Sequence, residues 1–526
     1  MLQGIETILN GGNGTQVAIV TSDGISYTFE DLRLQVTKYA LTIEAINPKQ
    51  VMVSCRNEFL ATASFLACLQ SEVHFGVCPY NRNTDLLMMK CGISETDLLI
   101  SDYRNDPHIL TLTEHGIGAM SENVALNFES GENLDRLIWS IRSIMDRIDI
   151  DELMEVKSSS NATQSGLIFT NFHKGLCSEG FKFSAFTKDK LYIGLEKVSK
   201  LAYYSPVTYL ESFELLYDIF IGIMGPLASG QYVKFANVNS YESTYESMHD
   251  TRTLYSSAST FENVLKLIVQ ETSHIKWFRK YALLRRIGDY ILRRRFKKDT
   301  NKIGSIVLTG KIRNIKNVNA LKIPITTVYA VGEVASFISV DTHKKLVEDY
   351  SVGIVDRKNI QIEHLKDGNY GPILVFAEDM AVTTNSSMIE ESFYHKYPGR
   401  LNTRDIGFME DGKLHIIDKD VFVYEYFSGK RIDTARIINR ATSLPWCKEA
   451  LLITNSNSSL VLLVEPDKDY ASKCQLRLED IDMLADELQT NLHKEHNGAF
   501  PLSVVVWTDT DGLDRQTYKI IVRDID

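Results

Sequence analysis

The residues with the clearest capacity for chemistry lie in the second half of the 526-residue chain. Tyr329-Ala-Val-Gly-Glu333 joins an aromatic ring to a carboxylate, and Thr403-Arg-Asp405 ends in a second carboxylate. Carboxylate oxygens accept several hydrogen bonds and are hard ligands for Mg²⁺. Tyr518-Lys519-Ile520 adds a lysine, whose compact charge suits anionic oxygens. These residue types are suited to binding Mg²⁺ and phosphate groups.

Other chemistries find little support in the sequence. The seven cysteines form no CxxC pair, the 12 histidines show no metal-ligand spacing, and no Ser/His/Asp triad is recognisable. Scattered cysteines in odd number are typical of reduced thiols, and the start of the chain lacks the features of a signal peptide, so we expect a cytoplasmic protein. The formal net charge of −11 argues against nucleic-acid binding. No apolar run approaches the roughly 20 residues that span a bilayer.

The hydrophobic pattern predicts strands that alternate with helices, which is typical of parallel α/β layers. Thr28 is a suitable N-cap for a helix to residue 46, with Asp31 in its first turn. Short strands and turns over 352–417 indicate a small β subdomain. Further expected helices are 58–70, 211–227 and 478–493, and further expected strands are 51–55, 77–80, 97–100, 166–170, 201–206, 232–235, 303–310, 450–454, 460–464 and 502–507.

The order of several motifs resembles the adenylate-forming superfamily of acyl-CoA synthetases, peptide-synthetase adenylation domains and luciferases. The matching segments, in chain order, are 26–32, 75–81, 218–230, 306–310, 329–333, 351–353, 403–405 and the terminal Tyr-Lys-Ile. Each match is weak, but their collinear order is difficult to obtain by chance. The resemblance implies an α/β fold with two α/β subdomains and a small β subdomain in residues 1–418. A smaller α+β lid domain would follow in residues 419–526.

The resemblance also implies roles for individual residues. Tyr329 would stack on the adenine of ATP, Glu333 would bind Mg²⁺, and Asp405 would hold the ribose hydroxyls. Lys519 would neutralise charge that develops at the α-phosphate, and Lys419 would replace an arginine of the nucleotide site. Glu333 and Lys519 are therefore the candidate catalytic residues.

Residues that contact the acid substrate are implied in the same way. They are Tyr209, Gly310 and Gly332. The hinge between the two domains would lie at Asp420. The protein would use ATP and Mg²⁺ to convert a small carboxylic acid to an acyl-adenylate, and CoA, a carrier protein or an amine would then accept the acyl group.

The segment expected to bind phosphate differs from the family pattern. Family members read Ser-Gly-Thr-Thr-Gly-x-Pro-Lys-Gly, whereas residues 158–166 read Ser-Ser-Ser-Asn-Ala-Thr-Gln-Ser-Gly. Ser158, Ser160 and Asn161 still supply hydrogen-bond donors, but the inner glycines and the lysine are replaced. Side chains at the glycine positions hinder close approach of a phosphate. The alternative hypothesis is a degenerate adenylation fold that serves as a binding or assembly module.

A basic segment over 276–298 places aromatic and aliphatic residues at near-helical spacing between arginines and lysines. It fits a helix that contacts an acidic protein or a membrane surface, and also a helix with one solvated face.

Overall fold

The computed structural model forms two compact units. It describes residues 3–78, 98–102, 110–113, 116–117, 167–174, 181–213, 215–237, 241–271, 285–299, 302–312, 314–347, 350–355, 359–362, 370–381, 383–385, 401–419, 423–425, 431–433, 437, 440–441, 444, 446–454, 460–474, 476–495 and 502–506. Unit 1 comprises Met1–Ile360, Val375–Leu401 and Asp411–Leu414, and the remaining residues form unit 2. The predicted boundary between residues 418 and 419 stays a prediction.

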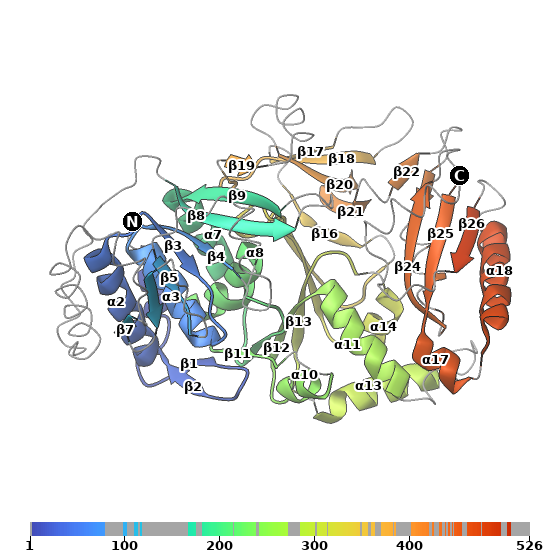
Figure 1. Ribbon diagram of the computed structural model, residues 1–526, viewed down its shortest axis with the longest axis horizontal. Helices are drawn as coiled ribbons and strands as arrows, with labels where there is room; N and C mark the ends of the chain where they lie inside the picture. Colours follow the sequence, from blue (N-terminus) through green and yellow to red (C-terminus); the bar gives the residue numbers. More distant parts are fainter. Residues whose placement is uncertain are drawn as a thin grey trace. The chain divides into compact units, whose positions relative to one another are not determined.

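Unit 1 contains two eight-stranded sheets (Figure 1). The first sheet has the order β15-β14-β13-β12-β10-β11-β1-β2. Its strands are β1 (Val17–Val20), β2 (Ser26–Thr28), β10 (Val207–Tyr209), β11 (Val233–Phe235), β12 (Thr253–Ser257), β13 (Ser305–Thr309), β14 (Ile325–Tyr329) and β15 (Ser339–His343). All neighbours from β1 to β14 in this order run parallel, and β2 and β15 are antiparallel edge strands. Strand β16 (Ser351–Ile354) follows β15 along the chain.

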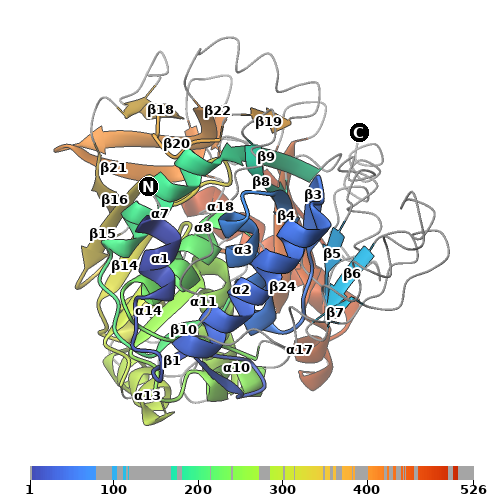
Figure 2. The same ribbon diagram turned by 90° about the vertical axis from the view of Figure 1, so that its left-hand side faces the viewer.

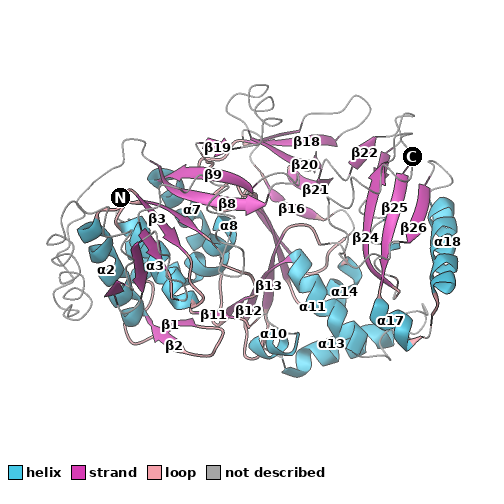
Figure 3. Cartoon of the chain, viewed as in Figure 1, coloured by secondary structure: helices cyan, strands magenta, loops and turns pink. Residues whose placement is uncertain are grey.

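The second sheet has the order β19-β9-β8-β4-β3-β5-β6-β7 and mixes parallel with antiparallel neighbours. Its strands are β3 (Gln50–Val53), β4 (His74–Val77), β5 (Leu98–Ile100), β6 (Leu110–Thr113), β7 (Gly116–Ile117), β8 (Leu167–Lys174), β9 (Phe181–Thr187) and β19 (Thr383–Asn385). The long antiparallel pair β8–β9 contrasts with the short parallel strands beside it (Figure 3).

Helices accompany both sheets, as the alternating pattern predicts. Helix α2 (Phe29–Ile46) begins at Thr28, whose side chain and that of Asp31 complete a capping box, and it lies beside α3 (Glu58–Gln70) (Figure 2). A box of this kind satisfies two backbone donors at the helix start. The other helices of unit 1 are α1 (Gln3–Leu9), α7 (Lys188–Ser199), α8 (Leu216–Ile219), the π-helix η3 (Phe220–Met224), α9 (Gly225–Ala228), α10 (Tyr241–Ser247), α11 (Ala258–Glu271), α13 (Arg285–Asp299) and α14 (Ile315–Ala320).

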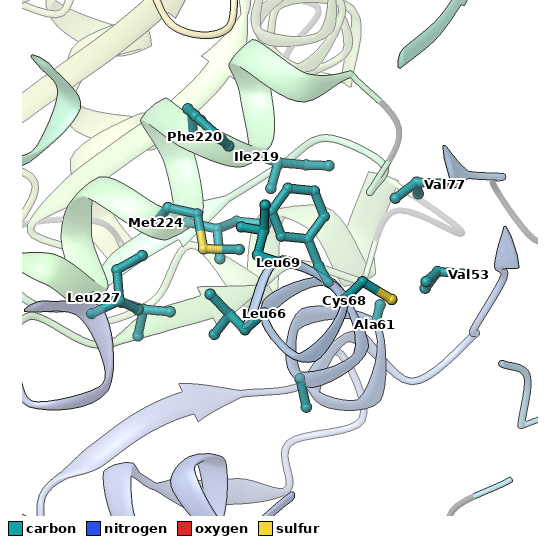
Figure 4. Close-up of a cluster of buried hydrophobic side chains, with 14 of the residues drawn as sticks. Val53, Ala61, Leu66, Cys68, Leu69, Val77, Ile219, Phe220, Met224 and Leu227 are labelled. Atoms are coloured by element: carbon teal, nitrogen blue, oxygen red, sulfur yellow. The ribbon is translucent and has the colours of Figure 1, made fainter. Parts of the chain in front are cut away.

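The core of unit 1 joins residues of both sheets through α3 and η3. Leu66 and Leu69 of α3 belong with Ile219, Phe220 and Met224 to one cluster of buried side chains (Figure 4). Eleven consecutive residues of α3, from Phe59 to Leu69, are buried. A helix that is apolar all round is expected to be enclosed by protein, and α3 meets that expectation.

Three predicted elements were wrong. The strand expected over 77–80 lies earlier in the chain, because β4 spans His74–Val77. The strand expected over 201–206 is a loop, because side chains satisfy its backbone: Tyr204 donates to Thr253 Oγ1 and Ser205 to Gln231 Oε1. The helix expected from Glu211 begins only at Leu216. The Glu211 carboxylate instead accepts a hydrogen bond of 2.6 Å from the backbone of Ser257, which holds this residue at a strand end.

Unit 2 contains short strands and two helices packed on a three-stranded sheet. Strands β21 (Lys413–Lys419), β20 (Leu401–Glu410), β18 (Tyr370–Val375) and β17 (Ile360–Ile362) are neighbours in that order, and β22 (Val423–Glu425) pairs with β23 (Arg431–Asp433). The second sheet of this unit consists of β24 (Cys447–Thr454), β25 (Leu460–Pro466) and β26 (Leu502–Val506), accompanied by α17 (Lys468–Lys473) and α18 (Leu478–Glu495). These elements confirm the predicted α/β fold class.

None of the helices in the described parts of the chain is long and apolar enough to cross a bilayer.

Gly222 in η3 provides a test of how tightly this core is packed. A Cβ at this position would lie 2.5 Å from the Tyr209 ring and 2.7 Å from the Tyr255 ring. We therefore expect Gly222→Ala to lower the free energy of unfolding by about 1–3 kcal/mol, as overpacking does. Urea unfolding measures this. Gly304→Ala is the matched control, because its nearest neighbour would be the Arg252 carbonyl at 3.8 Å. Equal stability of both variants would contradict the packing argument.

Candidate functional site

The carboxyl ends of four parallel strands of the first sheet bring several predicted residues to one edge. Strands β10, β12, β13 and β14 are consecutive neighbours, and Thr309 is in register with Ser257 on one side and Val328 on the other. Gly310 and Tyr329, the next residues along the chain, therefore come adjacent at the edge. In open α/β sheets, ligands bind at the carboxyl ends of the strands.

Gly310 adopts a backbone conformation that favours glycine and faces open space. Its φ is +79°, a left-handed value that other residues adopt only at a cost, and a Cβ built on it would have no neighbour within 4 Å. The conformation is therefore set by the backbone turn after β13, and the space beside Gly310 is free of described atoms. A backbone exposed in this way can contact a bound molecule directly.

Tyr329 and Glu333 lie at the end of β14 and in the turn that follows. Tyr329 is 4% exposed, and its carbonyl accepts a hydrogen bond of 2.7 Å from Ile338 N. Glu333 is 7% exposed, and Gly332 beside it is half-buried. Both predicted site residues are thus nearly buried.

A buried carboxylate fixes the loop that carries Glu333. Asp379 has a fully buried side chain, pairs with Lys197 of α7, and accepts hydrogen bonds from Ser336 N at 3.1 Å and Ser336 Oγ at 2.5 Å. The backbone reinforces this link, because Ala335 N donates to the Asp379 carbonyl at 3.0 Å and Ala381 N to the Glu333 carbonyl at 2.8 Å. Residues 333–336 are therefore held to residues 379–381 by side chain and backbone together. We call this arrangement the Asp379 clamp.

A second carboxylate lies at the same sheet edge, just after strand β10. Glu211 follows β10 and accepts hydrogen bonds from Ser257 N at 2.6 Å, Ser256 Oγ at 3.0 Å and Thr260 Oγ1 at 3.4 Å. Thr260 belongs to the first turn of α11, where a negative charge is favoured by the helix dipole. Glu211 therefore ties the end of β10 to the start of α11.

Tyr209, predicted to contact substrate, belongs to the packed core behind this edge. It is 1% exposed, its ring stacks on Tyr255 with centroids 5.5 Å apart, and its hydroxyl donates to the Ser212 carbonyl at 3.0 Å. The hydroxyl of Tyr255 in turn donates to the buried Asp218 at 2.5 Å. Burial, followed by the nearby Asp218 charge, raises the pKa of Tyr255 well above its ordinary value, so this hydroxyl stays protonated.

Two predicted residues belong to unit 2. Asp405 lies within β20, is 3% exposed, and its backbone N donates to Thr403 Oγ1 at 3.2 Å. Thr403 Oγ1 itself donates to the Ile373 carbonyl of β18 at 3.1 Å. Lys419 is the last residue of β21. The Thr403-Arg-Asp405 motif is therefore built on a strand whose neighbour holds it in place.

The remaining predicted residues lie outside the described parts of the chain. They are Ser158, Ser160 and Asn161 of the expected phosphate-binding segment, Asp420 of the expected hinge, and Lys519. Their assignments stay predictions.

Glu333 is a single carboxylate, and the described residues hold no group of three or more His, Cys, Asp or Glu able to bind a metal ion. A single carboxylate such as that of Glu333 is the kind of ligand that Mg²⁺ shares with phosphate oxygens and water.

Sequence reasoning overlooked the carboxylates that build this edge. Asp218 stands out in the sequence, because it is the one charged residue in the apolar run 215–230. Asp379 gives no comparable signal, because it stands beside Glu378 in the otherwise apolar run 373–382, and the sequence does not show which of the two carboxylates is buried. Only the approach of α7 to the 377–381 segment reveals its role.

Comparisons with known proteins identify the fold. No protein-family model matches the sequence, and a search of curated proteins finds no similar one. Solved structures do match along nearly the whole chain. One is the amide bond synthetase McbA from Marinactinospora thermotolerans, with 14% identity and a TM-score of 0.64, covering 96% of this chain and 95% of that one.

Two CoA ligases match over a similar extent. The benzoate CoA ligase from Burkholderia xenovorans shares 13% identity with a TM-score of 0.65, covering 98% of this chain and 99% of that one. The O-succinylbenzoate CoA synthetase MenE from Bacillus subtilis shares 14% identity with a TM-score of 0.62, covering 96% and 99%. The chain therefore has the fold of the adenylate-forming enzymes. The resemblance inferred from the motifs is confirmed at the level of the fold.

The Asp379 clamp leads to a stability prediction. Breaking a buried ion pair by removing one partner costs about 3–5 kcal/mol, and we expect Asp379→Ala to fall near the lower value because Lys197 is 33% exposed. Asp379→Asn keeps one acceptor for Ser336 and should cost less. Urea unfolding of the full chain measures both.

The control for this prediction lies on the same helix. Glu196 forms an exposed pair with Lys200, with side chains 71% and 70% exposed. Glu196→Gln should leave the free energy of unfolding almost unchanged, because exposed pairs contribute little. If Asp379→Ala were as mild as Glu196→Gln, the clamp would not be a stabilising feature.

Proposed function

We propose that the protein is a divergent adenylate-forming ligase, which activates a carboxylic acid with ATP and passes the acyl group to a thiol or an amine. The observation that carries the proposal is the edge of the first sheet, where Gly310, Tyr329 and the loop bearing Glu333 follow adjacent parallel strands. The fold supports it, because the matched solved structures include CoA ligases and an amide bond synthetase.

The proposed reaction has two steps. An oxygen of the acid attacks the α-phosphorus of ATP, the bond to the β-phosphate oxygen breaks, and acyl-adenylate and pyrophosphate result. A thiol or amine then attacks the acyl carbon, AMP leaves, and the acceptor loses its proton to water. Catalysis of this kind depends mainly on positioning and on neutralising negative charge.

The proposed roles follow from residue chemistry. Glu333 supplies a carboxylate for Mg²⁺, which when bound neutralises charge on the triphosphate. Gly310 lets a ligand approach the backbone. Asp405 accepts hydrogen bonds from the ribose hydroxyls, and Lys519 stabilises charge that develops at the α-phosphate. Tyr329 offers its ring to the adenine.

We further propose that the chain divides functionally near residues 418–419. Residues 419–526 would then form a lid that carries Lys519 to the reacting phosphate, with Asp420 as hinge. Lys419 would contact the nucleotide with a single charge, since lysine lacks the bidentate fork of arginine.

The phosphate-binding segment has two candidates in the sequence. Residues 158–166 are assigned by resemblance. Residues 175–180 read Gly-Leu-Cys-Ser-Glu-Gly and join the antiparallel strands β8 and β9, whose last pair is Lys174 with Phe181. Glycines at both ends of a short connection allow backbone N–H groups to turn toward an anion.

A second candidate function is a non-catalytic binding or assembly module. Two observations favour it. The glycines and the lysine expected within 158–166 are replaced, and Tyr329 and Asp405 are only 4% and 3% exposed. Residues that contact a nucleotide must present polar or aromatic surface to it, so ATP binding at these positions would require local opening.

Titration calorimetry with Mg·ATP separates the two functions. We expect saturable binding by the wild type. Asp405→Asn should weaken it by about 10- to 100-fold, because a hydrogen bond to a charged group contributes roughly 1.5–3 kcal/mol. Glu333→Gln should weaken Mg·ATP more than ATP without metal. Glu410→Gln, at the exposed end of the same strand as Asp405, is the control.

The same titration assigns the phosphate segment. If residues 158–166 bind phosphate, the double variant Ser158→Ala/Ser160→Ala weakens binding and Ser178→Ala leaves it unchanged. The reverse pattern would assign residues 175–180. Absence of wild-type binding at millimolar ATP would favour the binding-module function.

Pyrophosphate release tests the chemical step. We expect release with at least one member of a panel of aromatic and aliphatic acids that includes benzoate, anthranilate and O-succinylbenzoate. Lys519→Ala should lower the rate by about 10²–10³-fold, the usual effect of losing one group that stabilises transition-state charge. ATP affinity should change much less. Arg477→Ala, with a side chain 77% exposed, controls for loss of a positive charge elsewhere. A Lys519→Ala variant as active as the wild type would exclude this role.

A further inference from the structure

Helix α13 concentrates positive charge in an acidic protein. Its 15 residues include seven arginines or lysines and two aspartates, a formal net charge of +5, whereas the whole chain has a net charge of −11. The helix belongs to unit 1, where it packs against α11 and α14 (Figure 1). The charge is therefore presented on a folded scaffold.

One side of α13 is buried against the rest of unit 1. Gly288, Leu292 and Phe296 recur every four residues, and all three are buried. The Phe296 ring meets Phe261 of α11 edge to face, with centroids 6.3 Å apart. This i, i+4, i+8 row marks the inward face of the helix.

The opposite side carries apolar residues that no described residue covers. Ile287 is 45% exposed and Tyr290 is 52% exposed. Their spacing of three residues places both on one face, and Arg294, four residues after Tyr290, continues the row. Arg286 and Arg294 are exposed, and the Arg293 guanidinium lies 5.7 Å from the Tyr290 ring centroid. The outward face is thus two apolar side chains among arginines. We call it the α13 basic face.

We propose that the α13 basic face docks on an anionic lipid surface. A helix that lies in the plane of a bilayer buries its exposed apolar side chains at the boundary of the headgroups and places arginines against lipid phosphates and carboxylates. Tyr290 suits this position, because a tyrosine has an apolar ring and a polar end. Ile287 adds purely apolar area.

Charge complementarity also determines which part of the protein faces the lipid surface. An anionic surface repels the protein as a whole at a net charge of −11, so approach is favourable only through a local patch of opposite sign. A protein partner would need a pocket matched to Ile287 and Tyr290, whereas a lipid interface accepts these side chains without a preformed shape. The proposal concerns unit 1 and is independent of the proposed enzymatic activity.

Vesicle co-sedimentation of the full chain tests it. Vesicles of phosphatidylcholine with about 30 mol% phosphatidylserine are compared with pure phosphatidylcholine vesicles at low ionic strength. We expect binding to the anionic vesicles only, with loss at high salt, because the Debye length falls to about 3 Å at 1 M.

Variants locate the binding face. Each arginine near an anionic surface contributes about fivefold to the partition coefficient, so Arg286→Ala/Arg294→Ala should lower partitioning about 30-fold. Ile287→Ser/Tyr290→Ser should lower it at least roughly tenfold by removing apolar burial. All four residues are solvent-facing, so circular dichroism and thermal unfolding should stay as in the wild type.

The chain offers a matched control. Lys344, Lys345 and Val347 form another exposed basic and apolar cluster in unit 1, with Val347 61% exposed. Lys344→Ala/Lys345→Ala and Val347→Ser should bind vesicles like the wild type. The proposal is overturned by equal binding to neutral vesicles, by no binding at low salt, or by equal losses in the control variants. Binding to an acidic polypeptide such as polyglutamate, with none to anionic vesicles, would overturn it in favour of an acidic protein partner.

Discussion

Burial of one aromatic cluster holds unit 1 together. Phe65 of α3 is fully buried and meets Phe75 and Phe169 of the second sheet, with ring centroids 5.2 and 5.5 Å away. It also meets Phe213 and Phe220, which lie just before and within the helical segment that follows β10 of the first sheet. A fully buried Phe contributes about 1.5–3 kcal/mol, and each aromatic pair adds about 0.5–1.5 kcal/mol. The two sheets therefore share one core rather than two separate ones.

The candidate site depends on this core because its residues follow strands that the core immobilises. Gly310, Tyr329 and Glu333 lie where the parallel ladder ends, and two carboxylates secure the polypeptide beyond it. Glu211 connects β10 to α11, and Asp379 connects the Glu333 loop to α7. The polar groups that form these hydrogen bonds have partners within the protein, so they are not available to a ligand. The arrangement favours a rigid edge, at which the left-handed Gly310 faces open space.

The sheet edge and helix α13 differ in the charge of their side chains. The sheet edge is lined by carboxylates that are already hydrogen-bonded, whereas α13 presents arginines around exposed apolar side chains. If both proposals hold, a ligase of small acids would also meet an anionic surface through α13. The lipid surface and the nucleotide would then be recognised by separate groups, because no residue of the α13 basic face belongs to the sheet edge.

The sequence by itself determined the fold class, the boundaries of α2 and α3, and the strand β13. Local signals suffice for these: the Thr28 capping box, the continuous apolar run of α3, and the buried strand that leads to Gly310. Collinear motifs pointed to the adenylate-forming fold, because their order along the chain is itself a property of the sequence. The loop at 201–206 and the late start of α8 at Leu216 escaped prediction, because distant side chains satisfy the backbone there. Only the tertiary structure decided the roles of Asp379 and Glu211 and the burial of Tyr209. Contacts between segments far apart in the chain create those roles, and no local pattern of residue types records such contacts.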